Sequence, residues 1–259
     1  MAQLPSALKR RASRIRWVTL YYASWSVFGL VGLILNIACM ALLPMRGAPA
    51  LEHAVRSTIR RLFGAWLAWL HATGVVRIEW KGFGDAPLPS GTVYIANHPS
   101  IVDATVILAR LQDAVSIFKP SLMRNPAIGP AAIMAGYVRG DTGLDVIKAA
   151  AAKVAAGQSL LVFPEGTRTA PGTMLGRMRP GFALIADRAR APVRLLVIRS
   201  SPDLGTRGRP LWPAPSVLPG TLQIELDQEW AYAPGRSSAE LTQSVERRIC
   251  EVLGSATRV

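Results

Sequence analysis

The stretch TVYIANHPSIVD, residues 92–103, contains a change of pattern that decides the fold class. Its first half is a short apolar run, which predicts a buried strand. Its second half opens with polar residues and a proline, which is typical of the start of a helix. Similar apolar runs begin at residues 75, 114, 159, 193 and 221, and helical patterns alternate with them at 100–111, 126–135, 143–156, 180–190 and 237–253. This alternation predicts an α/β domain over residues 75–259, with helices covering a sheet.

The composition restricts what such a domain binds. Among 259 residues there are 30 Lys and Arg against 16 Asp and Glu, a net charge of +14, and half of the residues are hydrophobic. A basic and apolar chain favours an anionic membrane surface or phosphate-bearing substrates. No nucleic-acid partner is predicted, because the sequence has neither zinc-ligand spacing nor a basic strand pair interleaved with aromatic residues. The two cysteines, Cys39 and Cys250, indicate neither a disulfide framework nor a metal site.

The N-terminal part, residues 1–74, has a different organisation. Residues 17–43 carry no charged side chain, and about 20 apolar residues suffice to cross a bilayer. Basic residues precede this run at Lys9, Arg10, Arg11, Arg14 and Arg16. Because the run is longer than the apolar part of a signal peptide and ends without a small-residue cleavage site, it predicts a retained membrane anchor.

The amphipathic pattern of residues 51–74 predicts a second helix. Its arginines and tryptophans suit the headgroup region of a membrane, although the helix is equally compatible with packing on the catalytic domain, or with both. Arginines also follow the apolar run, at Arg46, Arg56, Arg60 and Arg61.

Positive charge on both flanks of the run favours a monotopic anchor over a single crossing. Gly29, Gly32 and Asn36 are expected to let the apolar segment bend or tilt. Both termini and the catalytic domain would then lie on the cytoplasmic face of the inner membrane.

His98 and Asp103 form a candidate catalytic pair. Pro99 suits the first turn of a helix, so we expect His98 at the strand-to-helix junction and Asp103 reaching back toward its imidazole. A carboxylate on one ring nitrogen leaves the other nitrogen free to accept a proton. The alternative is that His98 and Asp103 have no catalytic role and are only a helix cap and a solvated acid.

A second polar stretch, FPEGTRT at residues 163–169, follows another buried strand. It is expected at the carboxyl end of that strand, where α/β sheets bind ligands. Gly166 permits a tight turn with exposed amides, and the guanidinium of Arg168 suits a phosphate. Glu165 would orient Arg168 or accept a hydrogen bond from a substrate hydroxyl. An ordinary loop with one surface ion pair is the alternative.

Together the two stretches resemble a known family. NHPSIVD (97–103) matches the N-H-x4-D signature, and FPEGTRT the F-P-E-G-T-R signature, of the glycerolipid (PlsC-type) acyltransferases. The segment FKPSLMRNPAIGPAAIMAGYVRGD between them, residues 118–141, resembles a further block of that family. The resemblance covers roughly residues 75–200. It departs from the family at Pro120–Ser121, where an acidic or polar pair is usual, and at Arg194.

The resemblance implies a mixed sheet flanked by helices and a definite chemistry. An acyl chain would pass from acyl-CoA or acyl carrier protein to a lysolipid hydroxyl, foremost that of 1-acylglycerol 3-phosphate. His98 would take the hydroxyl proton, Asp103 would orient His98, and backbone N–H groups near a helix start would stabilise the oxyanion. The residues implied in substrate binding are Asn97, Lys119, Arg139, Glu165, Gly166, Thr167 and Arg168. No metal and no bound cofactor is implied.

Three other functions stay open at this stage. The acceptor would lack a phosphate if the protein acts on an aminolipid or a polyene lipid. A lipid-ester hydrolase would use the same His98–Asp103 pair with water. A lipid-binding protein without catalysis needs neither residue, so the intact pair argues against it.

Overall fold

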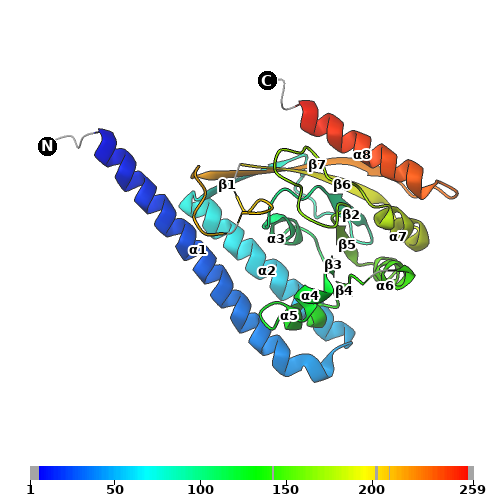
Figure 1. Ribbon diagram of the computed structural model, residues 1–259. Coiled ribbons are helices and arrows are strands. Elements are labelled where there is room, and N and C mark those ends of the chain that lie inside the picture. Colours follow the sequence, from blue (N-terminus) through cyan, green and yellow to red (C-terminus); the bar gives the residue numbers. More distant parts are fainter. Residues whose placement is uncertain (1–5, 142, 202–203, 210, 256–259) are drawn as a thin grey trace.

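A mixed β-sheet forms the centre of the molecule (Figure 1). The computed structural model describes residues 6–141, 143–201, 204–209 and 211–255, and of residues 6–12 only the backbone. The strands are β1 (Val76–Lys81), β2 (Val93–Ala96), β3 (Ala114–Phe118), β4 (Val138–Arg139), β5 (Ser159–Val162), β6 (Val193–Ser200) and β7 (Gly220–Trp230). Their order across the sheet is β1-β7-β6-β2-β5-β3-β4. Only the β6/β7 pair is antiparallel among the described strands, so the predicted mixed sheet is confirmed.

Helices cover both faces of this sheet (Figure 1). In chain order they are α1 (Ser6–Leu42), α2 (Pro49–Thr73), α3 (Asp103–Leu108), α4 (Pro120–Met123), α5 (Gly129–Met134), α6 (Leu144–Ala155), α7 (Gly181–Ala189) and α8 (Ser238–Ser255). A short 3-10 helix, Leu43–Met45, connects α1 to α2. The sequence analysis missed β4, because two residues are too few to produce an apolar run.

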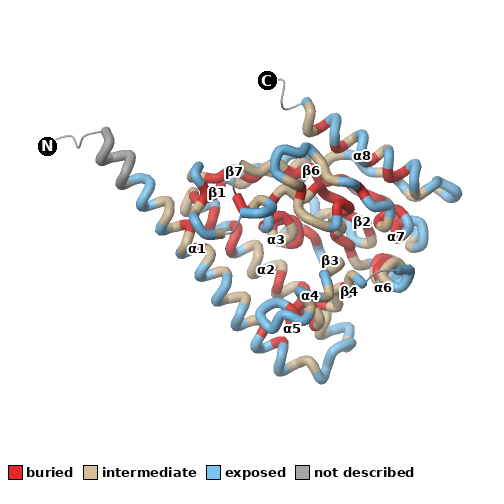
Figure 2. The backbone as a smooth tube through the Cα atoms, in the orientation of Figure 1, coloured by how far each residue is buried: buried red, intermediate tan, exposed pale blue. Residues whose placement is uncertain are grey.

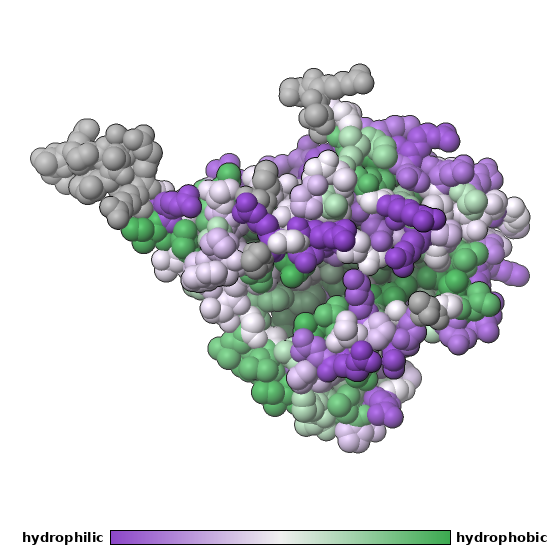
Figure 3. All heavy atoms as spheres, in the orientation of Figure 1, coloured by the Kyte–Doolittle hydropathy of each residue, from purple (hydrophilic) through white to green (hydrophobic). Residues whose placement is uncertain are grey.

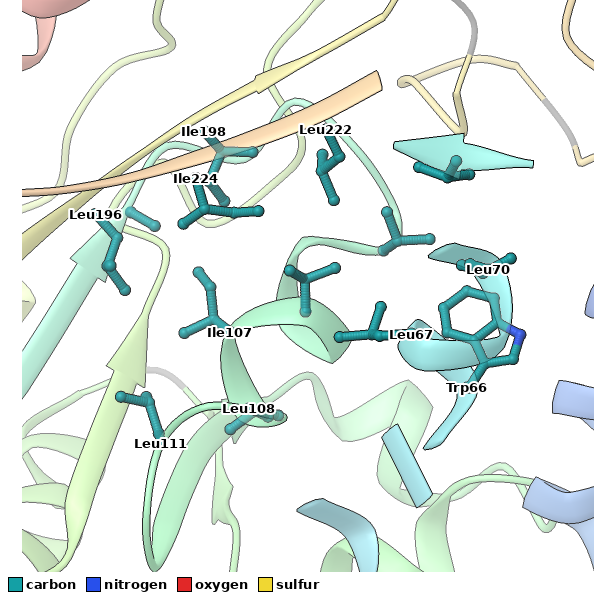
Figure 4. Packing of buried hydrophobic residues seen from close by; sticks show 14 of the residues in the cluster. Trp66, Leu67, Leu70, Ile107, Leu108, Leu111, Leu196, Ile198, Leu222 and Ile224 are labelled. Carbon is teal, nitrogen blue, oxygen red and sulfur yellow. The ribbon is translucent and has the colours of Figure 1, made fainter. Parts of the chain in front are cut away.

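The alternation of side chains along each strand explains the two layers. On β2, Tyr94 and Ala96 belong to the core shared with α2 and α3, whereas Val93 and Ile95 belong to the core shared with α6, α7 and α8. Successive residues of a strand point to opposite faces, so a run that is apolar throughout packs against helices on both sides. Figure 4 shows the first of these cores, and Figure 2 shows buried residues concentrated in the sheet and on the helix faces next to it.

Helix α1 presents apolar side chains to its surroundings. A span of 33 residues within it and the following turn, Ser13–Met45, is long and apolar enough to cross a membrane. Its exposed apolar residues recur at helical spacing: Ile15, Val27, Leu30, Leu33, Ile34, Ile37 and Met40. In Figure 3, hydrophobic residues gather along the side of the molecule formed by α1, while hydrophilic residues dominate the opposite part of this face. The predicted apolar N-terminal helix is therefore present.

The expected bend in the apolar segment is absent, because α1 is a continuous helix from Ser6 to Leu42. The Asn36 side chain donates to Gly32 O within the same helix and accepts from the Ala131 N–H at 3.0 Å. Asn36 therefore ties α1 to α5 and does not open the helix.

Helix α2 lies between α1 and the sheet, and its arginine face is not uniform. The arginines of this helix were expected to suit the headgroup region, but Arg56 is buried. Its guanidinium donates to Asp113 Oδ1 at 2.7 Å and to Ala135 O at 2.9 Å. This arginine therefore holds α2 onto the catalytic domain, so it is unavailable to a lipid headgroup. The helix ends at Thr73 because Gly74 adopts a left-handed conformation (φ +72°).

Candidate active site

The predicted site residues follow strands that run parallel in one half of the sheet. His98 follows β2, Phe163 follows β5, Lys119 follows β3 and Arg139 ends β4. The pairs β2/β5, β5/β3 and β3/β4 are all parallel, so the carboxyl ends of these strands lie along one edge. Neighbouring strands are about 4.8 Å apart, so β4 lies roughly 14 Å from β2. His98 and residue 163 are thus neighbours, while Lys119 and Arg139 lie progressively farther away.

His98 and Asp103 are in direct contact. The Nδ1 atom of His98 lies 2.8 Å from Asp103 Oδ2, which also accepts the Ser100 N–H at 2.7 Å. Asp103 is fully buried, and the His98 side chain is 19% exposed. An anionic Asp103 requires Nδ1 to carry the proton, so the lone pair of the neutral imidazole is on Nε2. No hydrogen bond to Nε2 is found within the part of the chain that the structure describes, and this atom is free to accept a substrate proton.

The local backbone differs from the expected one. Pro99 is not in the first turn of a helix, because α3 begins at Asp103 and residues 99–102 form a tight loop. Pro99 has no N–H group to donate. The chain then turns back, and the Asp103 N–H donates a hydrogen bond to Ser100 O. The contact between His98 and Asp103 therefore crosses a loop and does not follow a helix face.

Asp103 occupies an unfavourable environment for a charge. Burial raises the pKa of Asp103 to about 6, partly offset by the hydrogen bonds from His98 and Ser100. Its Oδ1 atom has no hydrogen-bond partner in the described residues. A carboxylate with one unsatisfied oxygen in a dry environment interacts strongly with the imidazolium that forms when His98 accepts a proton.

Phe163 also positions His98. The two rings are stacked, with centroids 4.0 Å apart and an interplanar angle of 18°. The sequence analysis gave the phenylalanine of FPEGTR no role, although its presence in the motif was the available signal. Stacking on one ring face and a hydrogen bond at Nδ1 together fix both the plane and the rotation of the imidazole.

Glu165 connects the two motifs from within the protein. Its Oε1 atom accepts the His98 N–H at 2.9 Å and the Thr169 hydroxyl at 2.9 Å, and its Oε2 atom accepts the Gly176 N–H at 2.8 Å. The expected pairing of Glu165 with Arg168 is wrong, since both carboxylate oxygens are taken by other donors. The Thr169 N–H donates to His98 O at 2.7 Å and completes the connection.

Arg168 is held by the loop between β6 and β7, to which the sequence analysis assigned no role. Its Nη1 donates to Gly205 O at 2.8 Å and to Thr206 O at 3.1 Å. Gly205 O also accepts the Ile101 N–H at 3.0 Å, so the arginine lies next to the His98–Asp103 loop. Gly205 has φ +65°, and a Cβ there would come within 2.5 Å of the Ile101 side chain. Loop sequences carry no periodicity that would reveal such contacts.

The remaining predicted residues have diverse surroundings. Gly166 adopts a left-handed conformation (φ +67°), as the predicted tight turn requires, and Thr167 is half-buried in that turn. The buried Asn97 exchanges two hydrogen bonds with the Ile198 backbone, at 2.8 and 2.7 Å, which makes it a structural link between β2 and β6. Arg139 is exposed and pairs with Asp141 at 2.7 Å.

Lys119 is exposed immediately before α4 and lies between the two regions of the edge. The structure therefore brings together His98, Asp103, Glu165 and Arg168, and leaves Arg139 apart from them.

The loop between His98 and Asp103 offers neither a nucleophile nor oxyanion donors. Ser100 is buried and its hydroxyl donates to Leu204 O. The N–H groups of His98, Ser100 and residues 101–103 already donate to protein acceptors. These N–H groups are therefore not available to stabilise an oxyanion. The N–H groups of Thr167 and Arg168 have no acceptor among the described residues.

A family model matches the part of the chain that contains both motifs. Residues 77–199, a little under half of the chain, match the model of a family described as Acyltransferase. The matched range contains both His98 and Arg168.

Three curated relatives are 1-acyl-sn-glycerol-3-phosphate acyltransferases. The coconut (Cocos nucifera) protein is 31% identical over 52% of this chain and 44% of its own length. The chloroplastic BAT2 protein of Brassica napus is 36% identical over 39% of this chain and 30% of its own. The mouse (Mus musculus) alpha protein is 31% identical over 53% of this chain and 51% of its own. The chain thus spans about half or less of the length of these relatives.

A solved structure extends the likeness of the fold to nearly the whole chain. The crystal structure of the 1-acyl-sn-glycerophosphate acyltransferase PlsC from Thermotoga maritima superposes with a TM-score of 0.69 and covers 96% of this chain and 98% of its own. The two sequences are 19% identical, so this likeness concerns the fold alone.

Proposed function

We propose that this chain, whose residues 77–199 match the acyltransferase family model, transfers a fatty acyl group from an acyl thioester to the hydroxyl of a lysolipid. The preferred acceptor is 1-acylglycerol 3-phosphate, the class of substrate in the names of the three curated relatives. One observation carries the proposal: the Nδ1 atom of His98 is 2.8 Å from a fully buried carboxylate, and its Nε2 atom has no partner among the residues that the structure describes.

The proposed reaction needs one proton relay. His98 Nε2 takes the proton of the acceptor hydroxyl while its oxygen attacks the thioester carbonyl carbon. The buried Asp103 stabilises the imidazolium, as a carboxylate does in other His-dependent acyl transfers. The tetrahedral intermediate collapses, the carbon–sulfur bond breaks, and the departing thiolate takes the proton back from His98. The exposed N–H groups of the Gly166 turn, at Thr167 and Arg168, are the proposed oxyanion donors.

The reaction requires no covalent enzyme intermediate. A thioester is already activated, and the Ser100 hydroxyl is buried and donates to Leu204 O. No metal or bound cofactor takes part in the proposed steps, and coenzyme A or acyl carrier protein acts as co-substrate.

The function is tested with the purified full chain, radiolabelled acyl-CoA or acyl carrier protein, and a panel of lysolipids with and without a phosphate monoester. Formation of phosphatidic acid from 1-acylglycerol 3-phosphate is the expected result. Preference for an acceptor without phosphate would overturn the assignment of the acceptor. Loss of lipid esters in the absence of any donor would identify a hydrolase and overturn the reaction itself.

Arg168 is proposed to hold the phosphate of the acceptor, because its guanidinium is fixed next to the His98 loop. Arg168→Ala should raise the KM for 1-acylglycerol 3-phosphate more than the KM for the acyl donor. A lost charge-assisted contact is worth ~1.5–3 kcal/mol, or roughly ten- to hundred-fold in kcat/KM.

Arg168→Lys provides the matched control for this measurement, since it keeps the charge and loses the planar fork. It should recover part of the affinity for the acceptor. Equal effects of Arg168→Ala on both substrates, together with a lowered melting temperature, would show that the arginine serves only to hold the loop at residues 205–206.

The contacts of α1 support a monotopic membrane anchor. Along its length α1 bonds to the catalytic domain: Arg14 donates to Ser216 O, Tyr21 to Leu211 O, and Asn36 accepts from Ala131. Residues 14–36 extend over roughly 33 Å at 1.5 Å per residue, which equals the hydrocarbon thickness of a bilayer. A crossing α1 would draw these partners into the bilayer. An α1 lying in the interface immerses only its exposed apolar stripe.

We therefore expect residue 13 and residue 85 on the same, cytoplasmic side of the inner membrane. Both positions are exposed, so Ser13→Cys and Asp85→Cys suit labelling in a Cys250→Ser background. In sealed right-side-out vesicles both cysteines should be protected from an impermeant reagent, and both should react after lysis. Labelling of residue 85 with protection of residue 13 would establish a true crossing.

A further inference from the structure

A basic pocket lies beside the FPEGTR turn and has no part in the proton relay. It has a volume of about 480 Å³ and is lined mainly by residues 165–180, together with Arg207 from the loop between β6 and β7. Four arginines line it: Arg168, Arg177, Arg179 and Arg207. Glu165, the carboxylate among its described lining residues, already accepts three hydrogen bonds from the protein. The pocket therefore holds an excess of positive charge.

Three of these arginines, Arg177, Arg179 and Arg207, are exposed, and none forms an ion pair with a residue that the structure describes. We call these three the outer arginines. Arg179 is held against the motif, because its N–H donates to Pro164 O and a Cβ at Gly166 would lie 3.3 Å from its Cζ. Guanidinium groups that share one concave site raise the local concentration of anions, and phosphate is the anion that they bind best.

The position of this pocket relative to the anchor decides between the two substrates. Among the residues that the structure describes, none from α1 or α2 lines it. A narrow apolar cavity of about 20 Å³ lies instead between these helices and the His98 loop, with Tyr21 and Trp66 on one side and Val102 and Leu204 on the other. The loop that carries the base thus has an apolar side toward the anchor and a basic side away from it. A lipid acceptor that arrives from the anchor side needs only the half-buried Arg168 of this pocket, which leaves the three exposed outer arginines to a water-soluble substrate.

We propose, on the basis of the proposed function, that the outer arginines bind the phosphate groups of the acyl carrier. Coenzyme A and acyl carrier protein share a 4′-phosphopantetheine, in which a long flexible arm separates the phosphate from the thioester. The donor therefore needs positive charge at a distance from His98. The phosphate of a lysolipid is only a few bonds from its reacting hydroxyl, and Arg168, fixed beside the His98 loop, suffices for it.

The test compares Arg177→Gln/Arg179→Gln/Arg207→Gln with Arg188→Gln/Arg236→Gln/Arg247→Gln, which removes the same charge from exposed positions outside the pocket. The first variant should raise the KM for acyl-CoA about ten-fold and leave kcat and the acceptor KM unchanged, because three individually weak exposed contacts are lost together. The difference in the KM for acyl-CoA between this variant and the wild type should shrink as the salt concentration rises. Salt screens exposed charges, so it should raise the KM of the wild type. The second variant should behave as the wild type.

Acyl-pantetheine without its phosphate isolates the proposed contact. On this donor the wild type and the outer-arginine variant should have the same kcat/KM. A difference in kcat/KM that persists without the phosphate would overturn the proposal. A raised acceptor KM would also overturn it. Parallel assays with acyl-CoA and acylated acyl carrier protein identify which phosphate the outer arginines bind. A raised donor KM with both carriers indicates the phosphate that they share, and a raised KM with only one indicates a phosphate of that carrier.

Direct binding keeps this inference separate from the proposed function. Calorimetric titration of the full chain with coenzyme A should show binding that the outer-arginine variant loses and the control variant keeps. A wild type that binds coenzyme A but transfers no acyl group would refute the proposed function alone. A wild type that transfers acyl groups, with outer arginines that affect neither binding nor donor KM, would refute this inference alone.

Discussion

His98→Ala is expected to abolish acyl transfer while the protein stays folded and membrane-bound. The imidazole is the group that accepts the hydroxyl proton, and its Nε2 atom has no structural partner in the described residues. Loss of a general base together with the imidazolium that it becomes should cost about 10³–10⁴-fold in kcat. The measurement is acyl transfer at saturating donor and acceptor, with circular dichroism and vesicle flotation on the same samples.

Two further variants make this result specific. His98→Gln keeps a side chain between Phe163 and Asp103 but cannot accept the proton, so it should be as inactive as His98→Ala. His71→Ala removes an exposed histidine near the end of α2 and should leave turnover unchanged. Near-normal turnover of His98→Gln would refute the proposed role of the base.

Asp103→Asn is expected to reduce kcat by about 10²–10⁴-fold, a loss of the kind seen when the carboxylate partner of a catalytic histidine is neutralised. The amide oxygen can still accept the Ser100 N–H, and the amide nitrogen can occupy the position of Oδ1, which has no partner in the described part of the chain. The side chain then no longer offers the negative charge that stabilises the imidazolium. The KM of the acceptor should change little, because Asp103 is fully buried and does not touch substrate.

The stability of this variant distinguishes catalysis from folding. The pKa of Asp103 rises from 3.8 to about 6 in the folded protein through burial, so the folded state binds the proton more tightly than the unfolded state. Its contribution to stability is therefore present below about pH 4 and is lost as the pH rises toward 6. At pH 7.5 the ionised carboxylate destabilises the fold, and Asp103→Asn should melt no lower than the wild type. A variant that is inactive because it has unfolded would contradict this account.

Much of the site was accessible from residue types and their order. An apolar run followed by His98 and Asp103, and another followed by Glu165, Gly166 and Arg168, place functional side chains at carboxyl ends of strands. The parallel pairing of β2 with β5 then brings the two ends together. The apolar run at 17–43 likewise predicted a long exposed helix, because length and the absence of charge are local properties of the chain.

Contacts between distant segments were decided only by the tertiary structure. Glu165 was expected to orient Arg168 or to accept from a substrate hydroxyl, but the fold presents it with the His98 and Gly176 N–H groups. Arg56 was expected to suit the headgroup region with the other arginines of its helix, yet it is buried and donates to Asp113, 57 residues away.

The same reason separates what the sequence by itself determined from what it did not. Periodicity and motif order report the local backbone and the chemistry of each side chain, so they determined the α/β class, the apolar N-terminal helix and the candidate base. Hydrogen-bond partners depend on which segments the sheet and the loops bring within about 3 Å. The loop at Leu204–Thr206 has no periodic pattern, and only the folded chain places its carbonyl groups against Ser100 and Arg168.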